Sequence, residues 1–166
     1  LMNNAGTGAV GPAEEITDDQ FKHEMQIDLF GTFVCAREFG KEMIKAGYGR
    51  VINIASMYGL VGNMIVGSAP YHAAKGGVVN LTRALAAEWG KYGVTVNAIC
   101  PGYFYTDLTT ATLDSDYFQA IAKSNIPLQR YGKAGELDTC ALFLASPCST
   151  YVNGQNIAVD GGYTCI

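Results

Sequence analysis

The sequence predicts an α/β fold in which a parallel sheet carries helices on both faces. Short β-branched segments recur along the chain, which is typical of buried strands. Segments of ten or more residues with the apolar period of a helix separate them, and parallel strands need crossover connections of that length. With 49% apolar and 16% charged residues among 166, the chain is able to bury a core.

The first predicted helix extends from Thr17 to Ala46. Thr17 and Gln20 have the form of a capping box, and two aspartates in the first turn suit the positive end of the helix dipole. Gly47 follows the last turn and is suited to the left-handed conformation that ends many helices. These signals bound one long amphipathic helix.

The remaining elements alternate in type. Pro70 favours the first turn of a helix that extends to Trp89, and Gly93 ends that segment. Residues 59–70 and 100–113 have the composition of loops. The other predicted elements are strands at 50–55, 94–99 and 155–159 and helices at 114–124 and 135–146.

Charge and cysteine usage exclude several classes of protein. The chain has 11 Lys and Arg against 15 Asp and Glu, a net charge of −4, so neither nucleic acid nor a membrane surface is an expected partner. No apolar run reaches about 18 residues, so no transmembrane helix is expected. The cysteines are too far apart for a zinc site or a disulfide framework, so we expect no bound metal. We expect the cysteines to be buried or half-buried free thiols, in a protein located in the cytoplasm. They are Cys35, Cys100, Cys140, Cys148 and Cys165.

Three side chains form a candidate catalytic group. Tyr71 and Lys75 are four residues apart and share one face of a helix, and Ser56 directly follows the preceding strand. A nearby ammonium favours the phenolate and lowers the pKa of a tyrosine, while a serine hydroxyl can hold a substrate oxygen. Such a group can move a proton on or off an alcohol or carbonyl oxygen. The alternative is an ordinary amphipathic helix with Tyr71 half-buried and Lys75 in solvent.

Five motifs occur in an order that resembles the classical short-chain dehydrogenase/reductase family. They are Asn3-Asn4-Ala5-Gly6, Ser56, Tyr71-x-x-x-Lys75, Asn97-Ala98-Ile99-Cys100-Pro101-Gly102 with Thr106, and Val159-Asp160-Gly161-Gly162. The resemblance implies a Rossmann-type, doubly wound domain that binds NAD or NADP, with residues 1–166 supplying strands 4 to 7. We therefore expect that the first three strands and the Gly-rich fingerprint, about 70–90 residues, precede this sequence, and that it does not bind dinucleotide tightly alone.

The resemblance also assigns roles within an oxidoreductase that acts on alcohol and carbonyl groups. Tyr71 would be the general acid/base, Lys75 would lower its pKa and bind the nicotinamide ribose, and Ser56 would orient the substrate. The implied cofactor contacts are Asn4, Ala5, Gly6, Tyr71, Lys75, Pro101, Gly102, Phe104 and Thr106. The implied substrate contacts are Ser56, Met57, Tyr71 and Tyr103. A homotetramer or homodimer is implied, with the two long helices and the last strand at interfaces.

One position departs from the family pattern. Where an N-L-x-G segment is usual, the sequence has Asp28-Leu29-Phe30-Gly31, so an aspartate replaces the asparagine that holds a water in a proton relay. Asp28 can accept a hydrogen bond and pair with Lys75, but it cannot donate when ionised. Asp28 is therefore a doubtful catalytic residue, and a non-catalytic binding or scaffold protein on the same fold is the alternative function.

A second glycine pattern is not expected to bind a dinucleotide as a fingerprint. Residues 6–11 read G-x-G-x-x-G, but Pro12 follows and the next helix begins only at Thr17, whereas the fingerprint needs a helix opening within the glycines. We interpret these residues as an ordinary loop. Neither G-x-S-x-G nor G-K-[ST] occurs, which disfavours hydrolase and kinase-like sites.

Two segments are expected to shape the substrate pocket, residues 57–69 and 103–130. Residues 56–60 and 103–108 resemble the sugar-acid and polyol branch of the family, the gluconate 5-dehydrogenases in particular. Arg130 has two interpretations, a partner for a substrate carboxylate or an ion-paired surface residue.

Overall fold

The computed structural model describes residues 1–106 and 109–166. Asp107 and Leu108, which belong to a segment expected to shape the pocket, lie outside the described residues. Within the described part, four strands form one sheet in which neighbouring strands are parallel. In order across the sheet they are β1 (Met2–Asn3), β2 (Gly49–Ile54), β3 (Val94–Pro101) and β4 (Asn156–Val159). The predicted α/β fold with a parallel sheet is confirmed.

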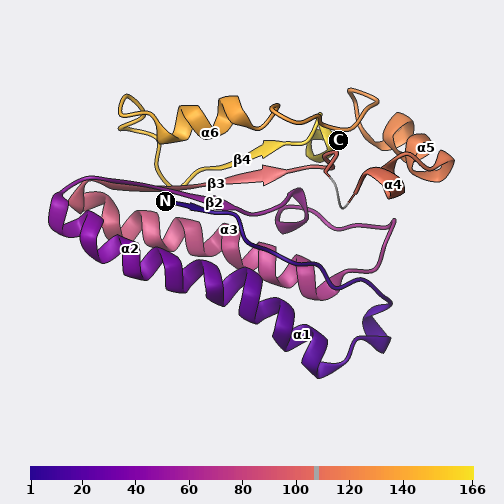
Figure 1. Cartoon of the computed structure of the whole chain (residues 1–166), viewed down its shortest axis with the longest axis horizontal. Coiled ribbons are helices and arrows are strands. Elements are labelled where there is room, and N and C mark those ends of the chain that lie inside the picture. The colour runs from indigo at the N-terminus through magenta and orange to yellow at the C-terminus, as the bar shows by residue number, and fades with distance from the viewer. Residues whose placement is uncertain (107–108) are drawn as a thin grey trace.

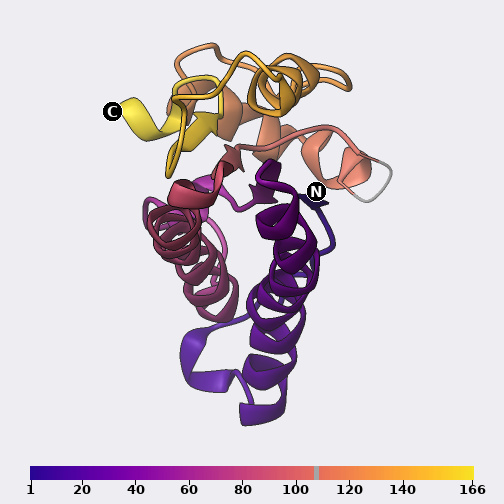
Figure 2. The same cartoon turned by 90° about the vertical axis from the view of Figure 1, so that its left-hand side faces the viewer.

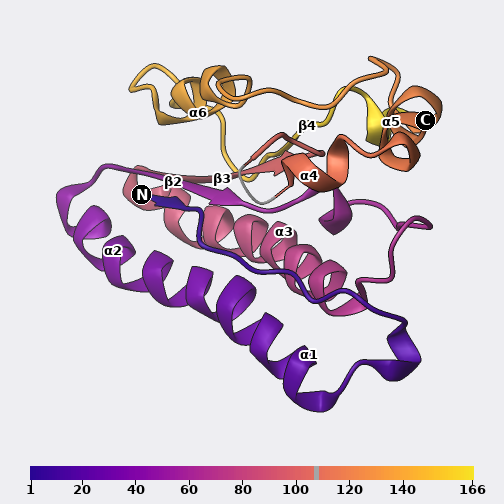
Figure 3. The ribbon, with the colours of Figure 1, turned by 45° about the vertical axis from the view of Figure 1, so that its right-hand side comes forward.

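Helices cover both faces of this sheet (Figures 1 and 2). One face carries α3 (Ala69–Trp89) and a long helix made of α1 (Asp18–Glu24), the π-helical η2 (Met25–Gly31) and α2 (Thr32–Ala46). The other face carries α6 (Asp138–Ala145), while α4 (Thr110–Leu113) and α5 (Asp116–Asn125) lie near the carboxyl ends of the strands (Figure 3). The described 3₁₀ turns are Ala13–Glu15, Met57–Gly59, Gly90–Tyr92 and Tyr163–Cys165.

The core has two halves because side chains alternate between the faces along each strand. Val51 and Val96 are buried in a cluster with residues of α2 and α3. Ile52 and Ile99 face the opposite way and pack against Leu144 of α6. Burial on both faces explains why these strands are nearly continuous apolar runs.

The helix boundary signals are confirmed at both ends of the first long helix. The Thr17 side chain accepts from the Gln20 amide and the Gln20 side chain accepts from the Thr17 amide, a complete capping box. Gly47 ends the helix with φ of 68°, a left-handed conformation that glycine adopts without steric cost. The π-helical η2 inside this helix has no signal that sequence analysis identified.

Two sequence expectations need correction. Residues 100–113 are not wholly a loop, because the ladder with β4 extends β3 to Pro101 and a short helix, Thr110–Leu113, closes the segment. The cysteines are free, but Cys35, Cys148 and Cys165 are exposed rather than buried. They lie on α2, in the turn after α6 and in the last 3₁₀ turn, outside the sheet core. Among the described residues, no helix has both the length and the apolar character that a membrane crossing requires.

Candidate active site

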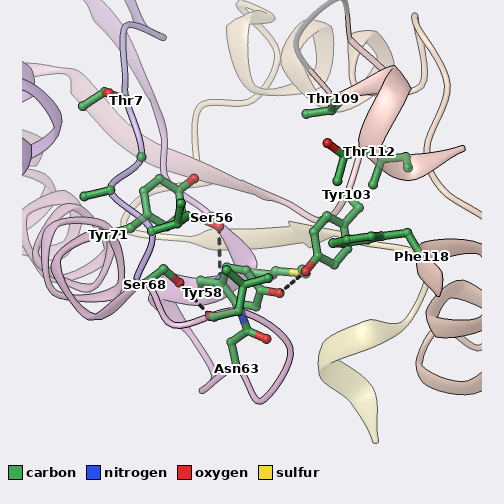
Figure 4. Close-up of a pocket in the computed structure, with 17 residues that line it drawn as sticks. Thr7, Ser56, Tyr58, Asn63, Ser68, Tyr71, Tyr103, Thr109, Thr112 and Phe118 are labelled. Carbon is green, nitrogen blue, oxygen red and sulfur yellow. Dashed lines mark hydrogen bonds between the residues drawn. The ribbon is translucent and has the colours of Figure 1, made fainter. Parts of the chain in front are cut away.

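The carboxyl ends of β2 and β3 open into a pocket of about 390 Å³. Loops leave neighbouring parallel strands at this edge, which makes it the usual place for a ligand crevice. Ser56 lies just beyond β2 and Gly102 just beyond β3, and both line the pocket. Figure 4 shows Ser56 and Tyr71 on one side of it and Tyr103 on the other.

Local structure positions Ser56 and Tyr71. The Ser56 hydroxyl accepts from the Tyr58 amide at 3.1 Å and so caps the 3₁₀ turn Met57–Gly59. Tyr71 follows Pro70 in the first turn of α3, where a proline costs no helical hydrogen bond. A hydroxyl can donate once and accept twice, so Ser56 can cap its turn and still bind a substrate oxygen.

The environment of Tyr71 keeps its hydroxyl protonated. Burial raises the pKa of Tyr71 above 10.0, a hydrogen bond with Ser56 lowers it, and the charges of Asp28 and Glu24 raise it. The sequence predicts that Lys75 lowers the pKa of Tyr71, but the pKa is raised overall. The Lys75 ammonium lies 5.5 Å from the centroid of the tyrosine ring, and its charge is matched by Asp28.

Lys75 and Asp28 form a buried ion pair beside Tyr71. The Nζ–Oδ2 distance is 3.2 Å, and the side chains are 5% and 0% exposed. Lys75 also donates to the carbonyl of Ile54 at 3.2 Å, and the other Asp28 oxygen accepts from the Thr7 amide at 2.8 Å. The interpretation with Lys75 in solvent is wrong, and Asp28 makes the predicted pairing.

Gly6 is the point at which the first loop approaches this ion pair. A Cβ at Gly6 would lie 3.2 Å from Lys75 Nζ and 3.2 Å from Asp28 Oδ1, so a side chain there would force a shift. The two residues before Gly6, Asn4 and Ala5, are exposed, and the loop lines the pocket with residues 7–10. These residues are irregular, as expected for a loop that is not a fingerprint.

Glu24 is a second buried acid that interacts electrostatically with Asp28 and Lys75, although the sequence motifs do not identify it. Its side chain is 1% exposed, and Oε2 accepts from the Ala9 amide at 2.8 Å. Burial raises the pKa of Glu24, the Ala9 amide lowers it, and the charges of Asp28 and Lys75 raise and lower it respectively. The available signal is its spacing, because an acid four residues before Asp28 lies on the same buried helix face.

Aromatic side chains form the far side of the pocket. The hydroxyls of Tyr58 and Tyr103 are 2.5 Å apart, and Tyr58 stacks on His72 with ring centroids 4.7 Å apart. Burial raises the pKa of Tyr103, and the bond with Tyr58 partly lowers it. Met57 also lines the pocket, so the fold brings the predicted substrate residues Ser56, Met57, Tyr71 and Tyr103 together.

Other predicted contacts lie elsewhere. Phe104 and Arg130 line a separate hollow, and Arg130 donates to both carboxylate oxygens of Glu136 at 2.8 Å. The ion-paired interpretation of Arg130 is therefore confirmed. Pro101 and Thr106 are also absent from the described lining of the pocket, so their cofactor contacts, like that of Phe104, stay predictions.

Two glycines expose backbone to the pocket near Tyr71. Gly8 and Gly102 line it, and even a Cβ added at Gly8 would lie 4.0 Å from the Tyr71 ring. A ligand can therefore approach the backbone of Gly8 and Gly102 closely, as the ring of a nicotinamide would require. Across the described residues, no group of three or more His, Cys, Asp and Glu is arranged to hold a metal ion.

Comparison with known proteins identifies the family. A family profile described as enoyl-(acyl carrier protein) reductase matches residues 1–164. The chain belongs to the short-chain dehydrogenase/reductase family. The family resemblance of the sequence motifs is thereby confirmed, and structures of family members confirm the Rossmann-type fold.

Similar proteins of this family are dehydrogenases of polyols and sugar acids. Galactitol 2-dehydrogenase (L-tagatose-forming) of Cereibacter sphaeroides is 40% identical, over 99% of this chain and 65% of its own length. Gluconate 5-dehydrogenase of Gluconobacter oxydans is 36% identical, over 99% and 63%. The structure of a gluconate 5-dehydrogenase from Burkholderia cenocepacia with NADP and tartrate has a TM-score of 0.95 at 38% identity, over 100% and 64%. The chain thus spans less than two thirds of the length of each of these three relatives.

Proposed function

We propose that the protein is an NAD- or NADP-dependent dehydrogenase/reductase that interconverts an alcohol and a carbonyl group. The observation that carries this proposal is the placement of Ser56 and Tyr71 in one pocket with the Lys75 ammonium beside them. Family membership supports the same activity, because the similar proteins are named dehydrogenases.

The proposed chemistry uses three side chains in distinct roles. A nicotinamide, when bound, supplies the acceptor or donor of hydride. Tyr71 gives its proton to a carbonyl oxygen or takes one from an alcohol, and Ser56 holds that oxygen in place. Lys75 positions the nicotinamide ribose and stabilises a negative charge on Tyr71 when the phenol ionises.

The cofactor and the oligomer are proposed on the same basis. The proposed cofactor contacts are Asn4, Ala5, Gly6, Tyr71, Lys75, Pro101, Gly102, Phe104 and Thr106, within one dinucleotide-binding domain. We also propose a homotetramer or homodimer, since Phe21 and Phe30 are 41% and 48% exposed beside an apolar groove between the long helices. A cytoplasmic location stays a prediction.

A polyol or a sugar acid is the proposed substrate. The pocket offers a hydroxyl at Ser56 and a pair of hydroxyls at Tyr58 and Tyr103, which suit a substrate with several hydroxyl groups. Relatives named for galactitol and gluconate support this class.

A substrate panel tests the proposal. The purified full-length protein is assayed with polyols, sugar acids and the matching ketoses, each with NAD and with NADP, by absorbance of the reduced cofactor. We expect turnover of at least one polyol or sugar acid with one of the two cofactors. Tight cofactor binding without turnover of any alcohol or ketone would instead favour the non-catalytic binding protein.

The replacement Asp28→Asn is expected to shift the pH profile of alcohol oxidation to lower pH. The charge of Asp28 raises the pKa of Tyr71, so its removal increases the phenolate fraction at a given pH. Oxidation at pH 7 should become several-fold faster, while carbonyl reduction, which needs the phenol, should not gain. Initial rates in both directions between pH 6 and 10 measure this effect. An unchanged profile would show that Asp28 does not influence Tyr71.

A further inference from the structure

Two carboxyl groups share one lysine beside the pocket. Glu24 ends α1 and Asp28 lies one turn later in η2, and they are 1% and 0% exposed. The basic side chain placed against them is Lys75 of α3, 3.2 Å from Asp28. An unpaired buried carboxylate is costly, and proteins commonly avoid it by keeping such a group protonated. One proton on the acid pair would make this cluster neutral.

The hydrogen-bond pattern shows where that proton would fit. Glu24 Oε1 and Asp28 Oδ2 are buried, and neither accepts a hydrogen bond among the described residues, although Oδ2 lies 3.2 Å from the Lys75 ammonium with which it forms the ion pair. The charge of Asp28 raises the pKa of Glu24, so the two carboxyl groups are near enough to influence each other. A proton on Glu24 Oε1 donated to Asp28 Oδ2 would satisfy both oxygens, whereas two ionised carboxylates would repel each other.

The remaining oxygens of the pair hold the first loop. Glu24 Oε2 accepts from the Ala9 amide and Asp28 Oδ1 from the Thr7 amide, both at 2.8 Å. Gly8 lies between these two anchors, on the side of the pocket that faces Tyr71. The acid pair therefore fixes the loop segment that lies closest to Tyr71.

We propose that Glu24 is a positioning residue of this site, which shares a retained proton with Asp28 and anchors the loop at Ala9. Its effect on Tyr71 rests on the proposed oxidoreductase function, whereas the shared proton and the anchored loop do not. Glu24 acts through Asp28 and the loop rather than through contact with substrate.

The charges that face Glu24 define the expected pH dependence. They are Asp28 on its own helix and Lys75 and Tyr71 from α3, while the loop presents backbone amides. Ionisation of Glu24 adds a negative charge that disfavours the Tyr71 phenolate. Because folding raises the pKa of Glu24 above 4.5, the unfolded chain releases this proton at lower pH than the folded one. The contribution of the Glu24 proton to the free energy of unfolding is full below about pH 4.5. It falls as the pH rises through the raised pKa of Glu24.

Thermal unfolding of the full-length Glu24→Gln protein tests the retained proton. The amide can still accept from Ala9 and donate to Asp28, but it does not titrate. We expect little difference in Tm from the parent protein near pH 4.5 and a gain of about 2–4 °C at pH 8. The control is Glu42→Gln, at a residue 73% exposed on the same long helix, which should show no such pH dependence. A Tm difference for Glu24→Gln that is negative or constant from pH 4.5 to 8 would overturn the proposal.

Hydrogen exchange tests the anchored loop without reference to activity. The replacement Glu24→Ala removes the acceptor for Ala9, so amide exchange at residues 7–10 should accelerate about 3- to 10-fold. The Glu24→Gln protein should exchange like the parent. Equal exchange in all three proteins would show that Glu24 does not hold the loop.

The kinetic arm separates this proposal from the proposed function. With an active parent protein, the rising limb of the pH profile of alcohol oxidation follows ionisation of Tyr71. Glu24→Gln removes a carboxyl group whose ionisation disfavours the Tyr71 phenolate, so this limb should move to lower pH, which a purely structural role would not do. Normal turnover with an unmoved limb would refute the effect on Tyr71. If the parent protein turns over no substrate, the proposed function fails, and the Tm and exchange results still decide whether Glu24 holds the proton and the loop.

Discussion

Replacing Tyr71 by Phe is expected to lower alcohol–carbonyl turnover by about 10²- to 10⁴-fold, the usual contribution of a positioned acid or base. The phenyl ring keeps the shape of the side chain next to Gly8 but has no hydroxyl to exchange a proton with substrate or to bond with Ser56. Cofactor affinity should change by less than about threefold, because the ring and the Lys75 ammonium beside it remain. Steady-state rates and a cofactor titration measure the two effects.

Tyr151→Phe is the matched control for this experiment, since Tyr151 is fully exposed and far along the chain from the pocket residues. It should leave turnover unchanged. A Tyr71→Phe protein that retains more than about a tenth of parental turnover would mean that another group transfers the proton.

Replacing Lys75 by Met is expected to lower the free energy of unfolding by about 3–5 kcal/mol. Methionine fills similar volume, but it leaves the fully buried Asp28 without its cation and the Ile54 carbonyl without its donor. Urea denaturation at pH 7 measures the loss. The control is Lys45→Met, at a side chain that is 70% exposed, which should change stability by less than about 0.5 kcal/mol.

A second replacement tests the cause of this loss. Lys75→Met combined with Asp28→Asn removes both charges, so the double variant should be more stable than Lys75→Met alone. Recovery of at least about 1 kcal/mol is expected, because the penalty arises from an unmatched buried charge. No recovery would locate the penalty in lost packing or in the bond to Ile54 instead.

The sequence carries most of the information about the fold. Local signals are sufficient where a few neighbouring residues decide the structure, as in the capping box at Thr17 and the left-handed Gly47. Apolar strands are equally clear because burial on both faces requires them. The π-helical η2 and the helix Thr110–Leu113 are harder to predict from sequence, because tertiary contacts rather than local propensity decide such short elements.

The candidate site is only partly visible in the sequence. Spacing identifies Tyr71 and Lys75 because they share one helix face, and Ser56 because it ends a strand. Spacing does not identify the bond between Tyr58 and Tyr103, which are far apart in the chain and meet only after folding. Spacing also predicts the wrong direction for the pKa of Tyr71. Burial and the charges of Asp28 and Glu24 raise this pKa, and both arise only in the tertiary structure.

Isotope transfer tests the central claim, that this pocket carries out oxidoreduction, most directly. The full-length protein is incubated with oxidised cofactor and an accepted polyol or sugar acid that carries deuterium at the reacting carbinol carbon, and the reduced cofactor is analysed by mass spectrometry. We predict that the reduced cofactor contains the deuterium and that Tyr71→Phe gives about 10²- to 10⁴-fold less of it per unit time. Reduced cofactor without deuterium, or equal transfer by the Tyr71→Phe protein, would contradict the proposed mechanism.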